Sequence, residues 1–212
     1  MTQELTVVVT GSTGKQGGAV ARGLLERGHK VRAVTRDPNS KQAKLLANAG
    51  AALVAASLGD AAGIKEALEG ATSLFAVTTP FEGTDAEIRQ GIAAADAAKA
   101  AGVHLVFTSV GSANQQTGIP HFDSKYEVEK HIAKVGVRAT ILAPVAFMEN
   151  LYFIKEQLAK GIYAAALPRQ GRSRKLPSWT SGRSPFASSR TPVASPASAS
   201  TSRATSSRGM TP

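Results

Sequence analysis

Three glycines near the N-terminus have the spacing of a loop that binds phosphate. Gly11, Gly14 and Gly17 follow an apolar run, residues 5–10, and open a helical pattern that begins at Gln16. Glycine permits a tight turn and a close approach by an anion, and the start of a helix offers unpaired N–H groups and a positive dipole. The pattern predicts that this loop holds the pyrophosphate of a dinucleotide at the first turn of a Rossmann-type domain.

The residues after the second apolar run bear on which dinucleotide binds. A site for NAD usually places an acid here to accept the ribose hydroxyls, but this chain has Arg36, with Lys41 close behind. A guanidinium suits bidentate contact with a 2′-phosphate, which an acid would repel. We therefore expect NADP(H) to be favoured over NAD(H), while Asp37 keeps NAD(H) open. In the glycine loop, Ser12 and Thr13 add hydroxyl donors.

A parallel sheet must position these residues, and the chain alternates apolar runs with helical patterns in the manner of βαβ units. The expected fold class is α/β, a doubly wound parallel Rossmann sheet. Strands are predicted at residues 5–10, 30–35, 52–56, 73–77, 103–108 and 139–142, and helices at 16–27, 41–48, 60–68, 85–101, 123–135 and 148–160. Glycines after the helical patterns predict left-handed caps at positions 28, 50, 70, 102 and 136.

Length and composition favour one soluble domain. The chain has 212 residues, 42% of them hydrophobic, which is enough for one sizeable core. It has no cysteine, and no apolar run reaches the roughly 20 residues that a spanning helix needs. We expect a cytoplasmic protein without membrane contact, a monomer or a homodimer. Neither Gly-x-Ser-x-Gly nor His-Glu-x-x-His occurs, so neither a serine hydrolase nor a metalloenzyme is expected.

The net charge of +10 comes mostly from the C-terminal part of the chain. Residues 1–167 hold 17 Lys and Arg and 15 Asp and Glu, whereas residues 168–212 hold 8 basic residues and no acid. Residues 1–167, which hold the apolar and helical patterns, are the predicted dinucleotide-binding domain. Because this part is nearly neutral, no nucleic-acid partner is expected for it. The second part is rich in Ser, Thr, Arg and Pro without apolar periodicity, and we predict a disordered tail. Because a shifted reading frame over residues 177–208 would restore apolar spacing and acids, the tail is also interpreted as a possible frameshift product.

An ordered series of motifs resembles the NmrA-like branch of the atypical short-chain dehydrogenases. The motifs are Gly11–Gly18, Val34–Pro38, Val77–Pro80, Phe107–Gly111, His121–Lys125 and Pro144–Asn150. The resemblance implies a Rossmann domain with a small C-terminal substrate region, which here would be truncated or replaced by the tail. It also implies that members are NADPH-dependent quinone and dye reductases or redox-sensing regulators that lack catalysis.

The same resemblance implies roles for individual residues along the cofactor. The phosphates would be held by Gly11, Ser12, Thr13, Gly14, Gln16 and Gly17, and the 2′-phosphate by Arg36 and Lys41. The adenine would lie beside Ser57 and Leu58, and the ribose and nicotinamide beside Thr78, Thr79 and Pro80. The nicotinamide side would be lined by Ser109, Lys125, Pro144 and Phe147. Phe147 could equally be a core residue. Lys125 would hydrogen-bond the nicotinamide ribose and raise the local positive potential.

The proton donor departs from the usual Tyr-x-x-x-Lys, in which the lysine lowers the pKa of the tyrosine. His121 stands four residues before Lys125, where the tyrosine would be. An imidazole can donate a proton near neutral pH. A quinone can also take its proton from water, so two alternatives remain. We expect an NADPH-dependent oxidoreductase that passes hydride to a small acceptor such as a quinone, with a non-catalytic NADP(H) sensor as the alternative.

Overall fold

Six parallel strands form one sheet. The computed structural model describes residues 4–115, 118–145 and 147–162, so the predicted tail and its boundary at residue 167 lie outside the described residues. The strands are β1 Thr6–Val9, β2 Lys30–Thr35, β3 Ala52–Ala55, β4 Ser73–Ala76, β5 His104–Thr108 and β6 Ala139–Leu142. Their order in the sheet is β3-β2-β1-β4-β5-β6, and every pair is parallel. The predicted fold class, a doubly wound α/β sheet, is confirmed.

Helices follow the strands at nearly the predicted positions. They are α1 Lys15–Leu25, α2 Lys41–Asn48, α3 Ala61–Leu68, α4 Thr84–Ala101, α5 Pro120–Val135 and α6 Lys155–Ala159, with 3₁₀ turns η1 Pro80–Glu82, η2 Ala113–Gln115 and η3 Met148–Ile154. All five glycines predicted to follow helices have a positive φ. Within the described residues, no helix combines the length and the hydrophobicity needed to cross a membrane.

Two predicted helices differ from the structure. Helix α5 begins at Pro120, not at Asp123, because proline is well suited to the first helical position, where its missing N–H costs nothing. His121 therefore lies within the first turn of α5. The single helix predicted for residues 148–160 is instead η3 followed by the short α6. Its aromatic and β-branched residues are weak helix formers, which is consistent with the irregular first part.

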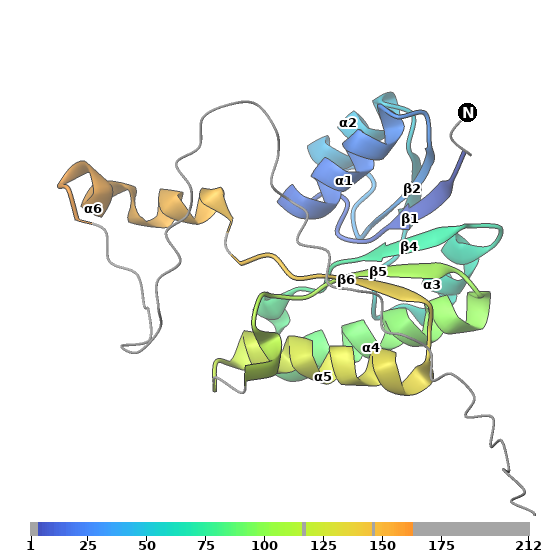
Figure 1. Cartoon of the computed structure of the whole chain (residues 1–212). Coiled ribbons are helices and arrows are strands. Elements are labelled where there is room, and N and C mark those ends of the chain that lie inside the picture. The colour runs from blue at the N-terminus through green and yellow to red at the C-terminus, as the bar shows by residue number, and fades with distance from the viewer. Residues whose placement is uncertain (1–3, 116–117, 146, 163–212) are drawn as a thin grey trace, which may run out of the picture.

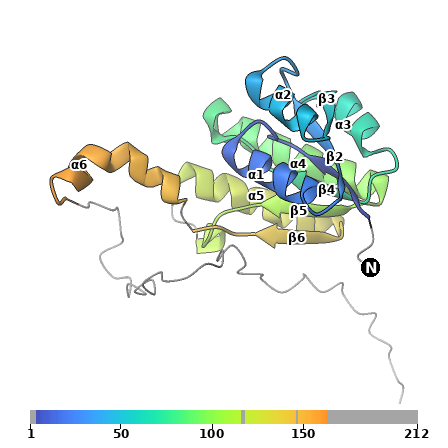
Figure 2. The same cartoon turned by 90° about the horizontal axis from the view of Figure 1, so that it is seen from above.

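The helices cover both faces of the sheet. Figure 1 shows α1 and α2 on one face and α3, α4 and α5 on the other, and Figure 2 shows the same layers from above. The alternation of β1 explains both contacts: Val7 and Val9 belong to the core beneath α1 and α2, whereas Val8 belongs to the core beneath the other three helices. Each face of the strand is buried, as expected for a parallel sheet.

The strand order places a crevice at the carboxyl end of β1. The chain runs from β1 outward through β2 to β3, then returns to β4 on the opposite side of β1. The loops after β1 and β4 therefore leave the sheet in opposite directions, and this divergence is where open α/β sheets bind ligands. The glycine loop lies at this point.

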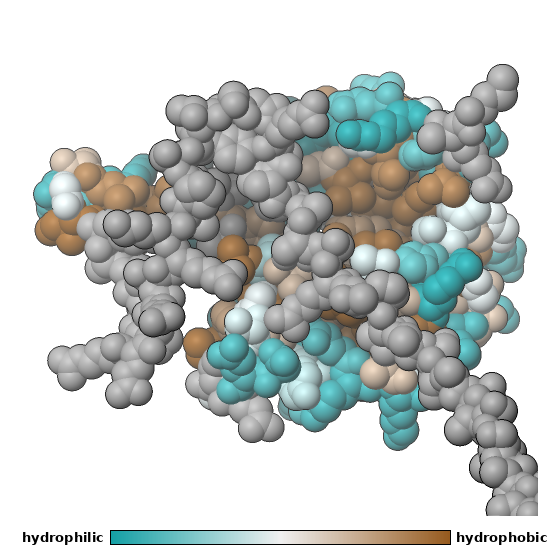
Figure 3. Space-filling view, viewed as in Figure 1, coloured by the Kyte–Doolittle hydropathy of each residue, from teal (hydrophilic) through white to brown (hydrophobic). Residues whose placement is uncertain are grey.

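The segment formed by η3 and α6 extends beyond the sheet in both views (Figures 1 and 2). It carries large hydrophobic side chains that are exposed, among them Tyr152 and Phe153 at 74% and 85%. The space-filling view shows hydrophobic surface on this projecting segment, at the left of Figure 3.

The contact between α4 and α5 supplies the first testable prediction. A Cβ at Gly91 would lie 2.4 Å from Cγ2 of Val128, a side chain that is fully buried. Gly91→Ala therefore overpacks the core, and we expect the free energy of unfolding to fall by about 1–3 kcal/mol in urea denaturation.

A glycine in α1 is the matched control. A Cβ at Gly23 would meet the far end of the flexible Arg27 side chain, so Gly23→Ala should leave stability unchanged or raise it slightly. Adding Val128→Ala to Gly91→Ala should recover part of the loss. Equal stability of Gly91→Ala and the parent protein would contradict this account of the helix contact.

Candidate functional site

The glycine loop turns the chain from β1 directly into α1. Gly11 has φ +58°, and a Cβ there would lie 2.6 Å from Cγ1 of Val77. A Cβ at Gly17 would lie 2.4 Å from the carbonyl oxygen of Gly11, so the first turn of the helix packs against the loop itself. Gly14 is the N-cap and offers no side chain to the helix N–H groups. By contrast, side chains of Ser40 and Asp60 cap α2 and α3.

The start of α1 therefore has the features that an anion site requires. Its first N–H groups lack a side-chain acceptor at the N-cap, and Gly11 and Gly14 leave backbone exposed beside them. The Ser12 hydroxyl donates to the carbonyl oxygen of Val34 at 2.8 Å and is buried, so it ties the loop to β2. Of the two predicted hydroxyl donors, Thr13 is the one that lines the neighbouring pocket.

A pocket of about 200 Å³ lies at the carboxyl ends of β1 and β2. It is lined by Thr13, Thr35, Arg36, Asp37, Ser40 and Gln42. The expected Arg36 is thus present, and its guanidinium forms an ion pair with Glu82 at 3.0 Å. The expected Lys41 is exposed and is not among the lining residues, where Gln42 stands instead.

The carboxylate of Asp37 is engaged by its own loop. Its Oδ1 accepts a hydrogen bond of 2.9 Å from the backbone N–H of Asn39. Its backbone oxygen accepts from the hydroxyl of Ser40 at 2.8 Å. These two hydrogen bonds close the turn that precedes α2. The bond from Asn39 also occupies one of the Asp37 carboxylate oxygens, which a ribose diol would need as hydrogen-bond acceptors.

On the opposite side of the crevice, Lys125 of α5 is buried and fully hydrogen-bonded. Its Nζ lies 3.1 Å from Oε1 of Glu87 and 3.0 Å from the backbone oxygen of Thr108, and it also donates to the hydroxyl of Thr78. An ammonium has three N–H donors, and these three acceptors use all of them. In this geometry, a hydrogen bond from Lys125 to a ribose would have to replace one of these contacts.

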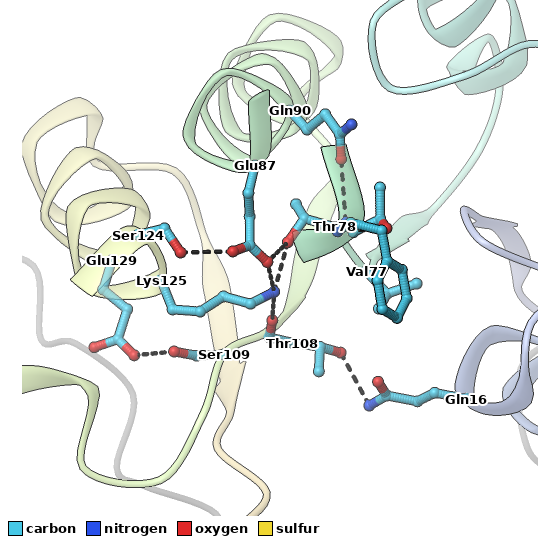
Figure 4. A network of polar contacts seen from close by, with 12 residues as sticks. Gln16, Val77, Thr78, Glu87, Gln90, Thr108, Ser109, Ser124, Lys125 and Glu129 are labelled. Carbon is cyan, nitrogen blue, oxygen red and sulfur yellow. Dashed lines mark hydrogen bonds and ion pairs between the residues drawn. The ribbon is translucent and has the colours of Figure 1, made fainter. Parts of the chain in front are cut away.

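Glu87 is the centre of this network, as Figure 4 shows. The side chain is 1% exposed and projects from α4. Besides the Lys125 ammonium, its carboxylate accepts hydrogen bonds from the hydroxyls of Thr78, at 3.0 Å, and Ser124. The buried carboxylate therefore joins the end of β4 to helices α4 and α5.

Burial and charge act on Lys125 in opposite directions. Desolvation lowers the pKa of the ammonium below its ordinary value, and the Coulombic attraction and hydrogen bond of Glu87 raise it in part. Because Glu87 balances the charge of Lys125, the positive potential expected from the lysine is largely compensated within the protein.

Two further polar contacts organise the same edge. The Ser109 hydroxyl donates to the Glu129 carboxylate of α5, so a residue expected near the nicotinamide is held from the helix side (Figure 4). Gln16 in the first turn of α1 donates to the hydroxyl of Thr108 at 3.2 Å. This bond links the phosphate loop to the end of β5.

The loop after β4 bridges the two halves of the site. The N–H of Thr79 donates to Oε1 of Gln90 at 3.2 Å, and Nε2 of Gln90 donates to Oε2 of Glu82 at 2.9 Å. Pro80 is exposed and opens the turn η1 that carries Glu82. The motif Thr78 to Pro80 thus lies just beyond the carboxyl end of β4.

The remaining expected residues are more scattered. The backbone oxygen of Pro144 accepts from the N–H of Gly111 at 2.8 Å, so it lies beside the loop after β5. Phe147 is half-buried, and His121 is exposed with its ring against Phe122. No hydrogen bond among the described residues joins His121 to the Glu87 network.

The adenine contacts expected after β3 have different surroundings. Leu58 is buried within the core that includes Val8 and Leu74. The Ser57 side chain is half-buried, and its hydroxyl oxygen accepts from the N–H of Gly59 at 3.3 Å. Of the pair, only the serine therefore has appreciable exposure at this edge.

Sequence reasoning missed four site residues: Glu82, Glu87, Gln90 and Glu129. For Glu87 a signal was available, because it is in helical phase with the buried small residues Gly91, Ala94 and Ala98. A carboxylate on the buried face of a helix requires a partner. The nearest buried cation in space is Lys125.

The family assignment follows from comparison with known sequences. The sequence profile of the NmrA-like family matches residues 3–181. The chain belongs to the NmrA-like family. A relative from Cladobotryum sp, the NmrA-like family domain-containing oxidoreductase FrzB, is 34% identical over 167 residues, which cover 72% of this chain and 49% of that protein. The chain thus spans about half the length of the curated relatives it matches.

Solved structures of similar fold hold nicotinamide dinucleotides. An NADPH-dependent quinone oxidoreductase from Escherichia coli, complexed with NADPH, aligns with a TM-score of 0.63 at 29% identity over 73% of this chain and 54% of that one. NmrA, described as a negative transcriptional regulator, aligns at 0.59 with 28% identity over 66% of this chain and 45% of that one, and was solved with NADP and with NAD. The resemblance inferred from the motifs is confirmed.

The buried Glu87–Lys125 pair gives the second prediction. Glu87→Gln leaves a buried ammonium without its counter-charge, and we expect a loss of about 3 kcal/mol in unfolding free energy near neutral pH. Without Glu87 the pKa of Lys125 falls further, so the unfolded chain binds more protons than the folded one as pH rises toward about 10. Stability of the variant should therefore recover at alkaline pH, measured by urea denaturation.

The double variant Glu87→Gln/Lys125→Met is the control, because it removes both charges. It should be more stable than Glu87→Gln at neutral pH, and its difference from the parent should vary less with pH. A deficit in Glu87→Gln that is the same at neutral and alkaline pH would contradict a charged Lys125 as its origin.

Proposed function

We propose that this protein is an NADPH-dependent oxidoreductase that passes hydride to a small acceptor such as a quinone. The observation that carries the proposal is the glycine-rich start of α1, which has no side-chain cap and lies beside a pocket lined by Arg36. Helix N-termini of this kind bind pyrophosphate at the switch point of doubly wound sheets. Similarity to an NADPH-bound quinone oxidoreductase supports the same assignment.

The preference for NADP(H) over NAD(H) rests on the pocket after β2. Arg36 is the positively charged residue of its lining, and Thr13, Ser40 and Gln42 add neutral polar groups. Asp37, the residue that kept NAD(H) open, has one carboxylate oxygen bound to a backbone N–H. This pocket therefore suits the dianionic 2′-phosphate of NADP(H) better than the free ribose diol of NAD(H).

At the other end of the crevice, the protein's task is orientation. NADPH, when bound, supplies the hydride, and the chemistry belongs to the cofactor. Thr78, Thr79 and Pro80 follow β4, and the loop after β5 lies beside them. The Glu87–Lys125 pair binds the hydroxyl of Thr78 and the backbone oxygen of Thr108, so it ties the ends of the two strands together. In this proposal Lys125 acts on the nicotinamide side through Thr78 and Thr108, and exchange of one hydrogen bond would let it reach the ribose.

The proton for a reduced acceptor has two possible sources. His121 is exposed, and among the described residues no hydrogen bond joins it to the Glu87 network, so water is the source favoured here. We expect His121→Phe to leave hydride transfer unchanged across the pH range, because a quinone takes its proton from solvent. A loss of turnover that appears only in this variant and changes the pH profile would assign the acid role to His121.

A second function is favoured by one specific observation. NmrA, the regulator that aligns at 28% identity, was solved with NADP and with NAD, and in this chain His121, not a tyrosine, stands four residues before Lys125. The alternative is a non-catalytic sensor of the ratio of reduced to oxidised cofactor. The proposal also keeps the expectations of a cytoplasmic protein, a monomer or homodimer, a small-molecule partner and no nucleic-acid or membrane partner.

Direct titration separates these functions. NADPH and NADH are added to the full chain while fluorescence of the reduced nicotinamide is followed, and a panel of quinones is then added while its absorbance is recorded. Binding with acceptor-dependent oxidation supports the reductase. Binding without oxidation supports the sensor, and absence of binding by either cofactor contradicts both.

Arg36→Ala tests the phosphate preference. Loss of a charge-assisted contact should weaken NADP⁺ binding about tenfold or more, because hydrogen bonds to charged groups contribute about 1.5–3 kcal/mol. The affinity for NAD⁺ should stay within about twofold, measured by calorimetry. Arg89→Ala, at an exposed position of α4, is the control. An unchanged ratio of the two affinities in Arg36→Ala would contradict the assignment of the pocket.

A further inference from the structure

An ion pair crosses the predicted cofactor crevice. Arg36 follows β2, whereas Glu82 lies at the end of η1 after β4, and β1 stands between these two strands in the sheet. Nη1 of Arg36 and Oε1 of Glu82 are 3.0 Å apart. The pair therefore spans the carboxyl end of β1, where the glycine loop begins.

The carboxylate of Glu82 is held in place from behind. Its second oxygen accepts a hydrogen bond of 2.9 Å from Gln90, whose own side-chain oxygen accepts from the backbone N–H of Thr79. Both oxygens thus have partners, one on each side of the crevice. The hydrogen bonds of Gln90 thus fix the position of the Glu82 carboxylate that pairs with Arg36.

The pair is nevertheless accessible to a ligand. The side chains of Arg36 and Glu82 are 76% and 44% exposed. An ion pair in such a setting contributes little, because water and salt screen it and side-chain entropy opposes it. A dianionic phosphate that makes bidentate contacts can therefore displace the carboxylate.

We propose that Glu82 is a determinant of cofactor selectivity, because its carboxylate competes with the 2′-phosphate of NADP(H) for the guanidinium of Arg36. The inference rests on the proposed function and deepens it. NAD(H) has no 2′-phosphate and does not need the guanidinium, so the competition lowers affinity for the phosphorylated cofactor selectively. Glu82 thereby reduces the preference for NADP(H) over NAD(H) that Arg36 creates.

The experiment compares Glu82→Gln with the parent protein by calorimetry against NADP⁺ and NAD⁺. The variant keeps a side chain that can bond Gln90 and removes the charge. We expect the dissociation constant of NADP⁺ to fall about fivefold, because the cofactor no longer has to break an exposed ion pair. The dissociation constant of NAD⁺ should change less than about twofold. Adenosine 2′,5′-bisphosphate should follow NADP⁺, and adenosine 5′-monophosphate should follow NAD⁺.

Asp85→Asn is the matched control. It removes one negative charge from an exposed position three residues further along, at the start of α4, without touching a residue that pairs with Arg36. It should leave both dissociation constants within about twofold of the parent values. The gain in Glu82→Gln should also shrink as salt is raised, because screening already weakens the pair.

Each outcome decides the inference. Equal gains for NADP⁺ and NAD⁺ would show that the carboxylate is a general barrier to the crevice, and this would overturn competition for the phosphate. No change for either cofactor, or the same gain in Asp85→Asn, would overturn it as well. If the parent binds NADP⁺ in these cases, the proposed function stands; if the parent binds neither cofactor, both fail.

Discussion

The close contact between the first turn of α1 and the loop that precedes it is the constraint on which the site depends. A side chain at Gly17 would run into the carbonyl oxygen of Gly11, so only a glycine lets the helix begin directly above the end of β1. That position aims the start of α1 at the crevice between β1 and β4, and no side chain caps it. The buried hydroxyl of Ser12 then fixes the loop to β2. The helix dipole and free N–H groups are thereby presented to whatever anion enters.

The two ends of the crevice are held by ion pairs of opposite character. Glu87 and Lys125 are buried, and breaking such a pair costs several kcal/mol, so the loops after β4 and β5 rest on a rigid frame. Arg36 and Glu82 are exposed, and a pair of that kind is worth about 1 kcal/mol or less. The Arg36–Glu82 pair can therefore exchange partners when a ligand arrives, while the buried Glu87–Lys125 pair holds the ends of β4 and β5 together. This difference follows from burial and not from residue type.

The sheet and its helices could be predicted because burial on both faces of parallel strands leaves continuous apolar runs, and glycines mark the helix ends. The pairing of Lys125 with Glu87 was missed: the helical phase of Glu87 indicates that it is buried, but the motif around the lysine says nothing of a carboxylate 38 residues earlier in the chain. A helix start at Asp123 was wrong because Pro120 already provides a suitable first position. Leu58, for which the resemblance implied an adenine contact, belongs to the core in the structure, and its contact with the adenine stays a prediction. Chain position alone does not reveal which way a side chain turns.

The central claim is that a nicotinamide dinucleotide lies across the carboxyl end of β1, with its phosphates at the start of α1. Amide resonances of the labelled full chain, followed during titration with NADP⁺, test this most directly. The account predicts that the largest shifts occur at residues 11–17, at Arg36 and at Thr79, while the strands at the far end of the sheet change little. Shifts concentrated elsewhere, or none at saturating cofactor, would contradict it.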